Sequence, residues 1–147
     1  MTAPAAIGQL VQRFESHGET YRSGGYNEAQ LREEFLNPFF EALGWDVYNR
    51  KGYSDAYKEV IHEAAIQVGG RTKAPDYCFR AGGGKASFFV EAKKPAVEIG
   101  EAASPAYQLR RYAWSAKLPV SILTDFEELA VYDCRIRPVK TDKAATA

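Results

Sequence analysis

The sequence predicts an α/β fold in which a central mixed β-sheet is flanked by α-helices. Two segments with a helical apolar stripe, at about residues 28–43 and 102–116, alternate with short segments rich in aromatic and β-branched residues. A glycine-rich turn at residues 81–85 joins the extended segments 74–80 and 87–93, which we therefore expect to pair as antiparallel strands. This order of segments predicts one layer of strands covered by helices.

The remaining elements follow from the same patterns. A short amphipathic helix is expected at about residues 7–14, and residues 58–70 are expected to form one strand with its continuation. Two more strands are expected at residues 118–124 and 129–135, separated by a turn. The apolar run at residues 88–90 suits a central strand that is covered on both faces.

The composition is that of one globular domain, with 147 residues, 46% of them hydrophobic and 26% charged. No apolar run approaches the ~20 residues that cross a bilayer, and the N-terminus does not resemble a secretory signal. We therefore expect a cytoplasmic protein that does not bind a membrane. Its two cysteines, Cys78 and Cys134, are expected to be separate buried thiols in a reducing compartment.

The charge balance limits the partners that this chain can bind alone. Its 19 basic and 19 acidic residues give a net charge of zero, whereas domains dedicated to nucleic acid are usually basic. If this domain meets DNA, metal ions or other parts of a larger protein must offset the phosphate charge.

The first long helix carries one carboxylate in an unusual position. Asn27 is expected to cap this helix and Pro38 to interrupt it. Glu28 falls within the apolar stripe of the helix, whereas Glu33 and Glu34 fall outside it. Spacing alone leaves two readings of Glu28 open: a first-turn carboxylate in water that favours the helix dipole, or a carboxylate that faces a site. The stripe consists of Leu31, Phe35, Leu36, Phe39 and Leu43.

Three charged residues on the paired strands could carry hydrolytic chemistry with a metal ion. Antiparallel pairing brings Asp76 close to Glu91, and carboxylates are the hard oxygen ligands that Mg²⁺ prefers. Side chains alternate along a strand, so Lys93 points to the same face as Glu91 and is placed to position or deprotonate a water. Ala92 points away, but its backbone carbonyl is a further candidate metal ligand.

An isolated Glu-x-Lys at a strand end is usually a solvated pair, so the context decides. Here the pair follows an apolar central strand, where charges are costly unless they are used or paired. Asp76 likewise lies among aromatic neighbours, Tyr77 and Phe79. This context favours a functional site.

The second long helix supplies further candidates. Gln108 and Tyr112 are spaced i, i+4 and share a helix face, from which both can hydrogen-bond a phosphate oxygen, a water or a catalytic carboxylate. Arg110 and Arg111 are candidates for contacts with the DNA backbone, although a solvated helix face is the alternative for at least one of them. His62 is expected to make one hydrogen bond from its strand, because two histidines exclude a histidine-rich metal site.

These residues resemble a known family. The motifs Pro75-Asp76, Glu91-Ala-Lys93 and Gln108-Leu-Arg-Arg-Tyr112 look like those of PD-(D/E)XK nucleases of the QxxxY subtype. The N-terminal endonuclease region of type IIG restriction enzymes, which fuse an endonuclease to an adenine methyltransferase, is similar over about residues 20–138. The nuclease region of the type I restriction motor subunit also looks similar. The supporting runs are Glu28–Arg32, Phe35–Phe40, Leu43–Asp46, Ala74–Tyr77, Phe89–Pro95 and Leu123–Asp133.

The resemblance implies a restriction-endonuclease-like fold and an endonuclease that hydrolyses double-stranded DNA with Mg²⁺, for which Mn²⁺ can substitute. It implies that Glu28, Asp76 and Glu91 hold the metal ion and that Lys93 positions the attacking water. Gln108 and Tyr112 would support the site and the strand being cut.

The chain departs from the fused enzymes in one respect. It contains no Asn-Pro-Pro-Tyr motif and no glycine-rich S-adenosylmethionine loop. We expect residues 1–19 to form a helical extension and residues 20–138, which the resemblance covers, to form the endonuclease domain. Residues 139–147 are expected to be the start of a linker. Methyltransferase and target-recognition domains, with any S-adenosylmethionine, would lie outside this chain, and two copies would associate for double-strand cutting.

Two alternatives to an endonuclease are considered. A catalytically silent DNA-binding or assembly module has no physical need for Asp76, Glu91 and Lys93 together. A glycosidase with an unrelated pair of carboxylates is disfavoured, because Trp45 and Trp114 do not lie near the carboxylates in the sequence.

Overall fold

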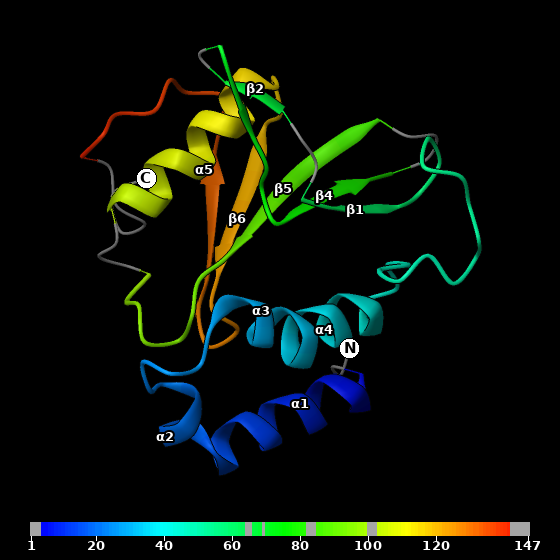
Figure 1. The fold of residues 1–147 in the computed structure, drawn as a ribbon, viewed down its shortest axis with the longest axis vertical. Coiled ribbons are helices and arrows are strands. Elements are labelled where there is room, and N and C mark those ends of the chain that lie inside the picture. The colour runs from blue at the N-terminus through cyan, green and yellow to red at the C-terminus, as the bar shows by residue number, and fades with distance from the viewer. Residues whose placement is uncertain (1–3, 64–65, 69, 82–84, 100–102, 142–147) are drawn as a thin grey trace.

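A five-stranded mixed sheet organises the structure, which is a computed structural model that describes residues 4–63, 66–68, 70–81, 85–99 and 103–141. Strands β5 and β6 pair in parallel and the other neighbours pair antiparallel. The predicted antiparallel pairing of β4 with β5 is confirmed (Figure 1). In spatial order the strands are β1 (Val60–His62), β4 (Tyr77–Arg80), β5 (Ala86–Ala92), β6 (Val120–Thr124) and β7 (Leu129–Asp133).

Helices cover both faces of this sheet, as the predicted fold class requires. Helix α5 (Ala103–Ser115) packs on one face (Figure 1). The other face is covered by α3 (Glu28–Leu31), the π-helical turn η1 (Arg32–Leu36) and α4 (Asn37–Ala42). The N-terminal helix α1 (Ala5–Ser16) lies outside α3 and α4, and the short α2 (Gly18–Tyr21) follows it. No helix of the described residues is long and apolar enough to cross a membrane.

Alternation along β5 divides the interior into two cores. Val90 and Ala92 belong to the core under α3 and α4, whereas Phe89 belongs to the core under α5. The central strand is therefore covered on both faces, as its apolar run predicted. Cys78 and Cys134 are buried and are not joined in a disulfide, also as predicted.

Pro38 shapes the first long helix in the way that its chemistry requires. Proline has no N–H, so it cannot donate to the carbonyl of Glu34 four residues earlier. The chain relaxes into one π-helical turn before Pro38, in which Asn37 N–H donates to the carbonyl of Arg32. The free Glu34 carbonyl accepts a hydrogen bond from the guanidinium of Arg13, which reaches across from α1. A side chain of α1 thereby supplies the hydrogen bond that the interrupted helix lacks.

The exact extent of the apolar stripe differs from the prediction. Leu31, Phe35 and Leu36 are fully buried, but Leu43 is 52% exposed. The helix already ends at Ala42, and Gly44 with a φ of 105° turns the chain away. Leu43 therefore lies beyond the helical register that would have buried it.

The single strand predicted at residues 58–70 is wrong. Strand β1 ends at His62, and Glu63 adopts a left-handed φ of 53°, which turns the chain out of the sheet. The next strand, β2 (Ile66–Val68), pairs instead with β3 (Arg71–Lys73) as a separate two-stranded hairpin. This hairpin lies beside α5 (Figure 1). The glycine turn predicted between β4 and β5 falls at residues 82–84, outside the described residues.

The turn between β6 and β7 is held by a small polar network. Asp125 is only 3% exposed, and its carboxylate accepts a hydrogen bond of 2.7 Å from Glu128 N–H. Thr124 Oγ1 accepts the N–H of Phe126 at 3.0 Å and stabilises its left-handed φ of 75°. Burial raises the pKa of Asp125 to about 6, although the hydrogen bond from Glu128 opposes this shift.

This shift predicts how stability depends on pH. An acid whose folded pKa lies above its ordinary value contributes stability that is present at low pH and is lost as the pH rises through the folded pKa. Asp125→Asn keeps a hydrogen-bond acceptor but cannot ionise. From about pH 4 to about pH 7, the free energy of unfolding of the wild type should therefore fall by about 2–3 kcal/mol relative to Asp125→Asn. Urea unfolding of both proteins at the two pH values measures this. If the free energies of unfolding of the wild type and Asp125→Asn differed by the same amount at both pH values, the prediction would be contradicted.

Candidate functional site

Asp76 and Glu91 meet where the central strands end. Asp76 directly precedes β4. The residue before it, Pro75, has no N–H with which the strand could extend its hydrogen bonds further back. Its carbonyl accepts the N–H of Glu63, and its Oδ2 accepts the N–H of Ala92 at 2.7 Å. These bonds fix the carboxylate of Asp76 beside Glu91, the residue that precedes Ala92. The predicted pairing of the two acids is thus present.

The carboxyl group of Glu91 is strongly affected by its surroundings. Burial raises the pKa of Glu91 far above its usual range, and both a hydrogen bond with Asp76 and repulsion by its charge raise it further. Lys93 partly offsets this effect on the pKa of Glu91, so its ammonium lies close enough to act on the pair. Two acids held this close favour either a shared proton or a bound cation.

Lys93 and Tyr112 border the pair. Lys93 N–H donates to the carbonyl of Thr124 at 3.0 Å, which extends the β5–β6 ladder one residue beyond the strand. Tyr112 is half-buried on α5, and its pKa is raised by burial and then by the charge of Glu91, with a smaller contribution from Asp76. Tyr112 therefore lies within electrostatic reach of both carboxylates. Gln108, one turn earlier on α5, is exposed, and its side chain makes no hydrogen bond within the described part of the chain.

Glu28 is the first residue of α3 and is partly buried. Asn27 and Gln30 form a complete capping box around it, which fixes where the helix begins. Residues four apart share a helix face, so Glu28 lies on the face of Arg32. No group of three acidic, histidine or cysteine side chains close enough to hold a metal ion occurs in the described residues, so the role predicted for Glu28 stays a prediction.

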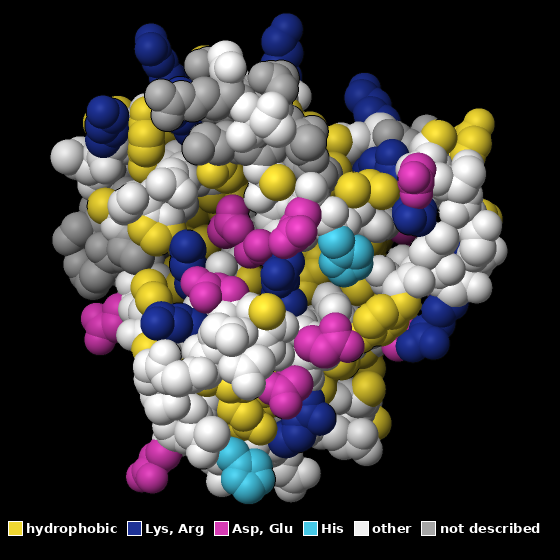
Figure 2. All heavy atoms as spheres, in the orientation of Figure 1, with side chains coloured by type: hydrophobic (Ala, Val, Ile, Leu, Met, Phe, Trp, Pro, Cys, Tyr) yellow, Lys and Arg dark blue, Asp and Glu magenta, His cyan; other side chains and the backbone are white. Residues whose placement is uncertain are grey.

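Two residues of the site were not predicted from the sequence. Arg32 lies with Nη1 3.4 Å from Asp76 Oδ1 and with Nη2 3.6 Å from Glu63 Oε1. The position of Arg32 one turn after Glu28 was a signal that could have identified it. Glu63 carried no such signal, because its place depends on the left-handed turn that ends β1. Figure 2 shows acidic and basic side chains gathered near the centre of this face, between the strands and α3.

The prediction that Arg110 contacts DNA is wrong. Arg110 is only 4% exposed and lies in the apolar stripe of α5, where its guanidinium is 5.9 Å from the centre of the Tyr132 ring. A side chain packed against β7 cannot meet a backbone phosphate. Its spacing from Ala106 and Ala113, four and three residues away, was the signal for this burial. Arg111 is exposed, and its DNA contact stays a prediction.

His62 behaves as the sequence predicted. Its Nε2 lies 2.9 Å from the carbonyl oxygen of Val47, and its ring packs near Tyr77. This single hydrogen bond ties β1 to the segment after α4. His62 therefore has a structural role in this arrangement.

The residues present fit a divalent cation of the Mg²⁺ type. Mg²⁺ is usually bound through one or two carboxylates, with water and substrate phosphates completing its octahedron. Asp76 and Glu91 supply two such carboxylates, and their mutual repulsion is what a cation relieves. The backbone carbonyl of Ala92 stays the further candidate ligand.

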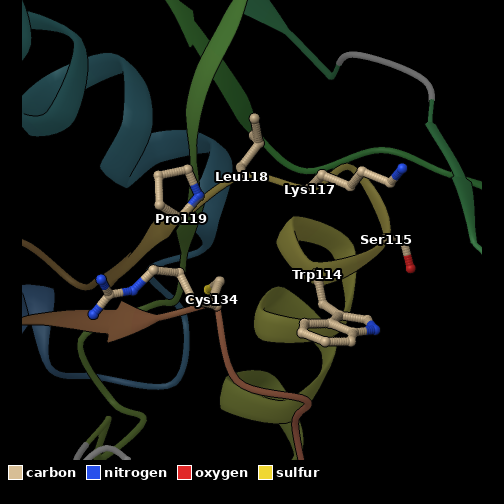
Figure 3. Close-up of a pocket in the computed structure, with 7 residues that line it drawn as sticks. Trp114, Ser115, Lys117, Leu118, Pro119 and Cys134 are labelled. Carbon is tan, nitrogen blue, oxygen red and sulfur yellow. The ribbon is translucent and has the colours of Figure 1, made fainter.

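A separate cavity of about 650 Å³ contains no carboxylate and so does not compete for this chemistry. It lies where α5 ends and where β7 leaves the sheet, and Trp114 points along one side of it (Figure 3). Cys134 and Leu118 also line it.

Comparisons with known proteins identify the family of this chain. The family profile described as "Type I restriction enzyme R protein N terminus" matches residues 25–140. The type II restriction enzyme and methyltransferase RM.Eco57I of Escherichia coli is 43% identical over 141 residues, which are 95% of this chain. The chain spans about 14% of the length of that relative. No solved structure matches significantly.

The repulsion between the two acids predicts a stabilising substitution. Glu91→Gln keeps the shape of the side chain but removes the charge, so in EDTA the variant should be more stable than the wild type at about pH 9 and about equal at about pH 5. The sign follows because the raised folded pKa makes the wild type lose stability as the pH rises. Excess Mg²⁺ should reduce or reverse the difference, since binding stabilises the wild type. Thermal unfolding checks this; a variant that is less stable in EDTA at both pH values would contradict it.

Proposed function

The chain belongs to the family of type I restriction enzyme R protein N termini, and on this premise we propose that it is a Mg²⁺-dependent endonuclease module that hydrolyses phosphodiester bonds of double-stranded DNA. The observation that carries the proposal is the juxtaposition of Asp76 and Glu91 with Lys93 at the end of β5. It joins hard oxygen ligands to an ammonium that can act on a water.

Each residue of the site has a distinct task in this proposal. Asp76 and Glu91 hold the cation, which when bound stabilises the negative charge that develops on the phosphate. Lys93 orients the attacking water as an ammonium, or takes its proton when it is the neutral amine. Tyr112, with Gln108 one turn earlier, orients the carboxylates and the strand being cut. Glu28 is proposed as a further ligand from α3.

The geometry favours this function over a silent module with the same fold. An ionised Glu91 costs stability here, because burial disfavours its charge and the nearby charge of Asp76 disfavours it further. A module that only binds or assembles gains nothing from this cost. A glycosidase is also disfavoured, because its site needs two separated carboxyl groups around a sugar, whereas here the charge of Lys93 acts on Glu91.

The module is proposed to act within a larger protein. The relative's printed name combines a restriction enzyme with a methyltransferase, and we propose that methylation with S-adenosylmethionine and target recognition lie outside residues 20–138. Association of two copies would allow both strands to be cut. The buried thiols Cys78 and Cys134 suit a reducing cytoplasm.

Substitutions in the site test the mechanism. Asp76→Ala and Glu91→Ala should abolish plasmid cleavage by the intact protein in Mg²⁺, because each removes a ligand. Lys93→Ala should lower the rate by about 10²–10⁴-fold. Lys93→Arg should not restore it, because a guanidinium does not act as a base near neutral pH. Gln108→Ala and Tyr112→Ala should have milder effects.

The matched control is Asp55→Ala, which removes an exposed carboxylate paired with Lys58 outside the site. It should cleave at the wild-type rate. Adenine methylation by the intact protein should survive all of these changes. Wild-type cleavage by Asp76→Ala or Glu91→Ala would show that this constellation is not the active site.

Dependence on the rest of the protein is a separate prediction. Because the 147 residues carry no net charge, they release few counterions on binding. The chain alone should therefore bind duplex DNA with a Kd above ~1 µM at about 150 mM salt, without sequence preference. Fluorescence anisotropy with a labelled duplex measures this. Tight and site-specific binding by the chain alone would contradict it.

A further inference from the structure

Arg32 is the cation closest to Asp76, and its surroundings do not satisfy it. The two ion pairs of Arg32, 3.4 Å to Asp76 and 3.6 Å to Glu63, are longer than the ~2.7–2.9 Å of a charge-assisted hydrogen bond. Its Nε is buried and has no hydrogen-bond partner among the described residues. A buried N–H without a partner is costly, so this arrangement does not use the donors of the guanidinium.

The position of Arg32 also conflicts with a cation at the carboxylate pair. Asp76 uses Oδ2 to hold Ala92 N–H at 2.7 Å, whereas Oδ1 does not take part in this bond. Arg32 lies beside this same oxygen. A divalent cation at Oδ1 would therefore meet a positive guanidinium within a few ångströms, and the two charges would repel each other.

A ligand that attracts Arg32 away from Asp76 would remove this conflict. The planar guanidinium fits phosphate oxygens in a two-pronged geometry. The side chain of Arg32 is 21% exposed and that of its second partner, Glu63, is 66% exposed, so neither is sealed from a ligand at this face. A DNA phosphate brought to the carboxylate pair would lie within reach of Arg32.

Resting on the proposed function, we propose that Arg32 exchanges partners when DNA binds: it neutralises Asp76 in the free protein and holds the phosphate of the bound strand in the complex. Arg32 thereby weakens cation binding to the free protein and strengthens DNA binding. The cation is admitted mainly when a substrate phosphate is present.

This exchange has a signature that a structural role lacks. Removing the charge of Arg32 should tighten cation binding without DNA and weaken DNA binding, so one substitution shifts the two affinities in opposite directions. If Arg32 only held the site together, its loss would weaken both ligands or neither. Arg32→Lys should retain part of the DNA affinity, because lysine binds phosphate as a point charge.

The experiment measures both affinities for the whole chain. Calorimetric titration with Mn²⁺ in the absence of DNA should show that Arg32→Gln binds the ion at least about fivefold more tightly than the wild type does. Anisotropy with a labelled duplex in Ca²⁺ at low salt should show weaker binding, and the slope of log K against log salt should fall in magnitude by about 0.9. Circular dichroism confirms that each variant folds; if Arg32→Gln does not, Arg32→Met, which also removes the charge, supplies both measurements.

The matched control is Arg135→Gln. Arg135 is exposed and pairs with Asp133, which lies opposite Val120 at the start of β6, whereas Glu91 lies beside Leu123 near its end. This control should leave Mn²⁺ affinity unchanged. Equal Mn²⁺ affinity in the wild type and Arg32→Gln, or DNA affinity unaffected by the charge of Arg32, would overturn the inference.

Asp76→Ala separates this failure from that of the proposed function. If it binds Mn²⁺ as well as the wild type does, the metal site itself is wrong. If it loses Mn²⁺ while Arg32→Gln behaves as the wild type, only the partner exchange is wrong. A wild type that binds no duplex even at low salt would overturn the phosphate contact.

Discussion

The hydrogen bond from Ala92 N–H to Asp76 Oδ2 is the interaction on which the site depends. It joins the residue before β4 to the last residue of β5, where the backbone ladder between these strands has ended. A side chain here takes the place of a backbone acceptor, and so the carboxylate is fixed beside Glu91. The carbonyl of Asp76 meanwhile holds Glu63. One residue thus binds the residue after β1 through its backbone and β5 through its side chain.

The rest of the fold keeps this arrangement rigid. The aromatic side chains of Tyr77 and Phe79 are fully buried directly after Asp76, and Tyr77 Oη donates to Asn37 Oδ1 at 2.5 Å. This bond connects β4 to the start of α4. On the opposite face, α5 packs through Ala106, Leu109 and Ala113 and brings Tyr112 to the carboxylates. Two well-packed cores therefore support a site that is itself electrostatically unfavourable when no cation is bound. Such local cost is common where binding chemistry must be preorganised.

Patterns that depend on local chemistry predicted much of this structure. The alternation along β5 and the apolar stripe of the first long helix predicted the sheet, its two covered faces and the pairing of Asp76 with Glu91. The elements that escaped prediction depend on contacts between distant segments. The π-helical turn before Pro38 is completed by Arg13 from another helix. The break after β1 depends on the conformation of Glu63, a residue type with no preference for a left-handed φ.

The site shows the same division. Asp76, Glu91 and Tyr112 were found from spacing, because strand and helix periodicity fix which side chains share a face. Arg110 was expected at the surface but is buried in line with its apolar helix neighbours, and no prediction was made for Arg32, which lies beside Asp76. The central claim is that Asp76 and Glu91 share a cation. Anomalous diffraction from a crystal soaked in Mn²⁺ tests it most directly. The account predicts a peak within ~2.0–2.5 Å of both carboxylates; a well-occupied Mn²⁺ peak elsewhere with none between these two residues would contradict it.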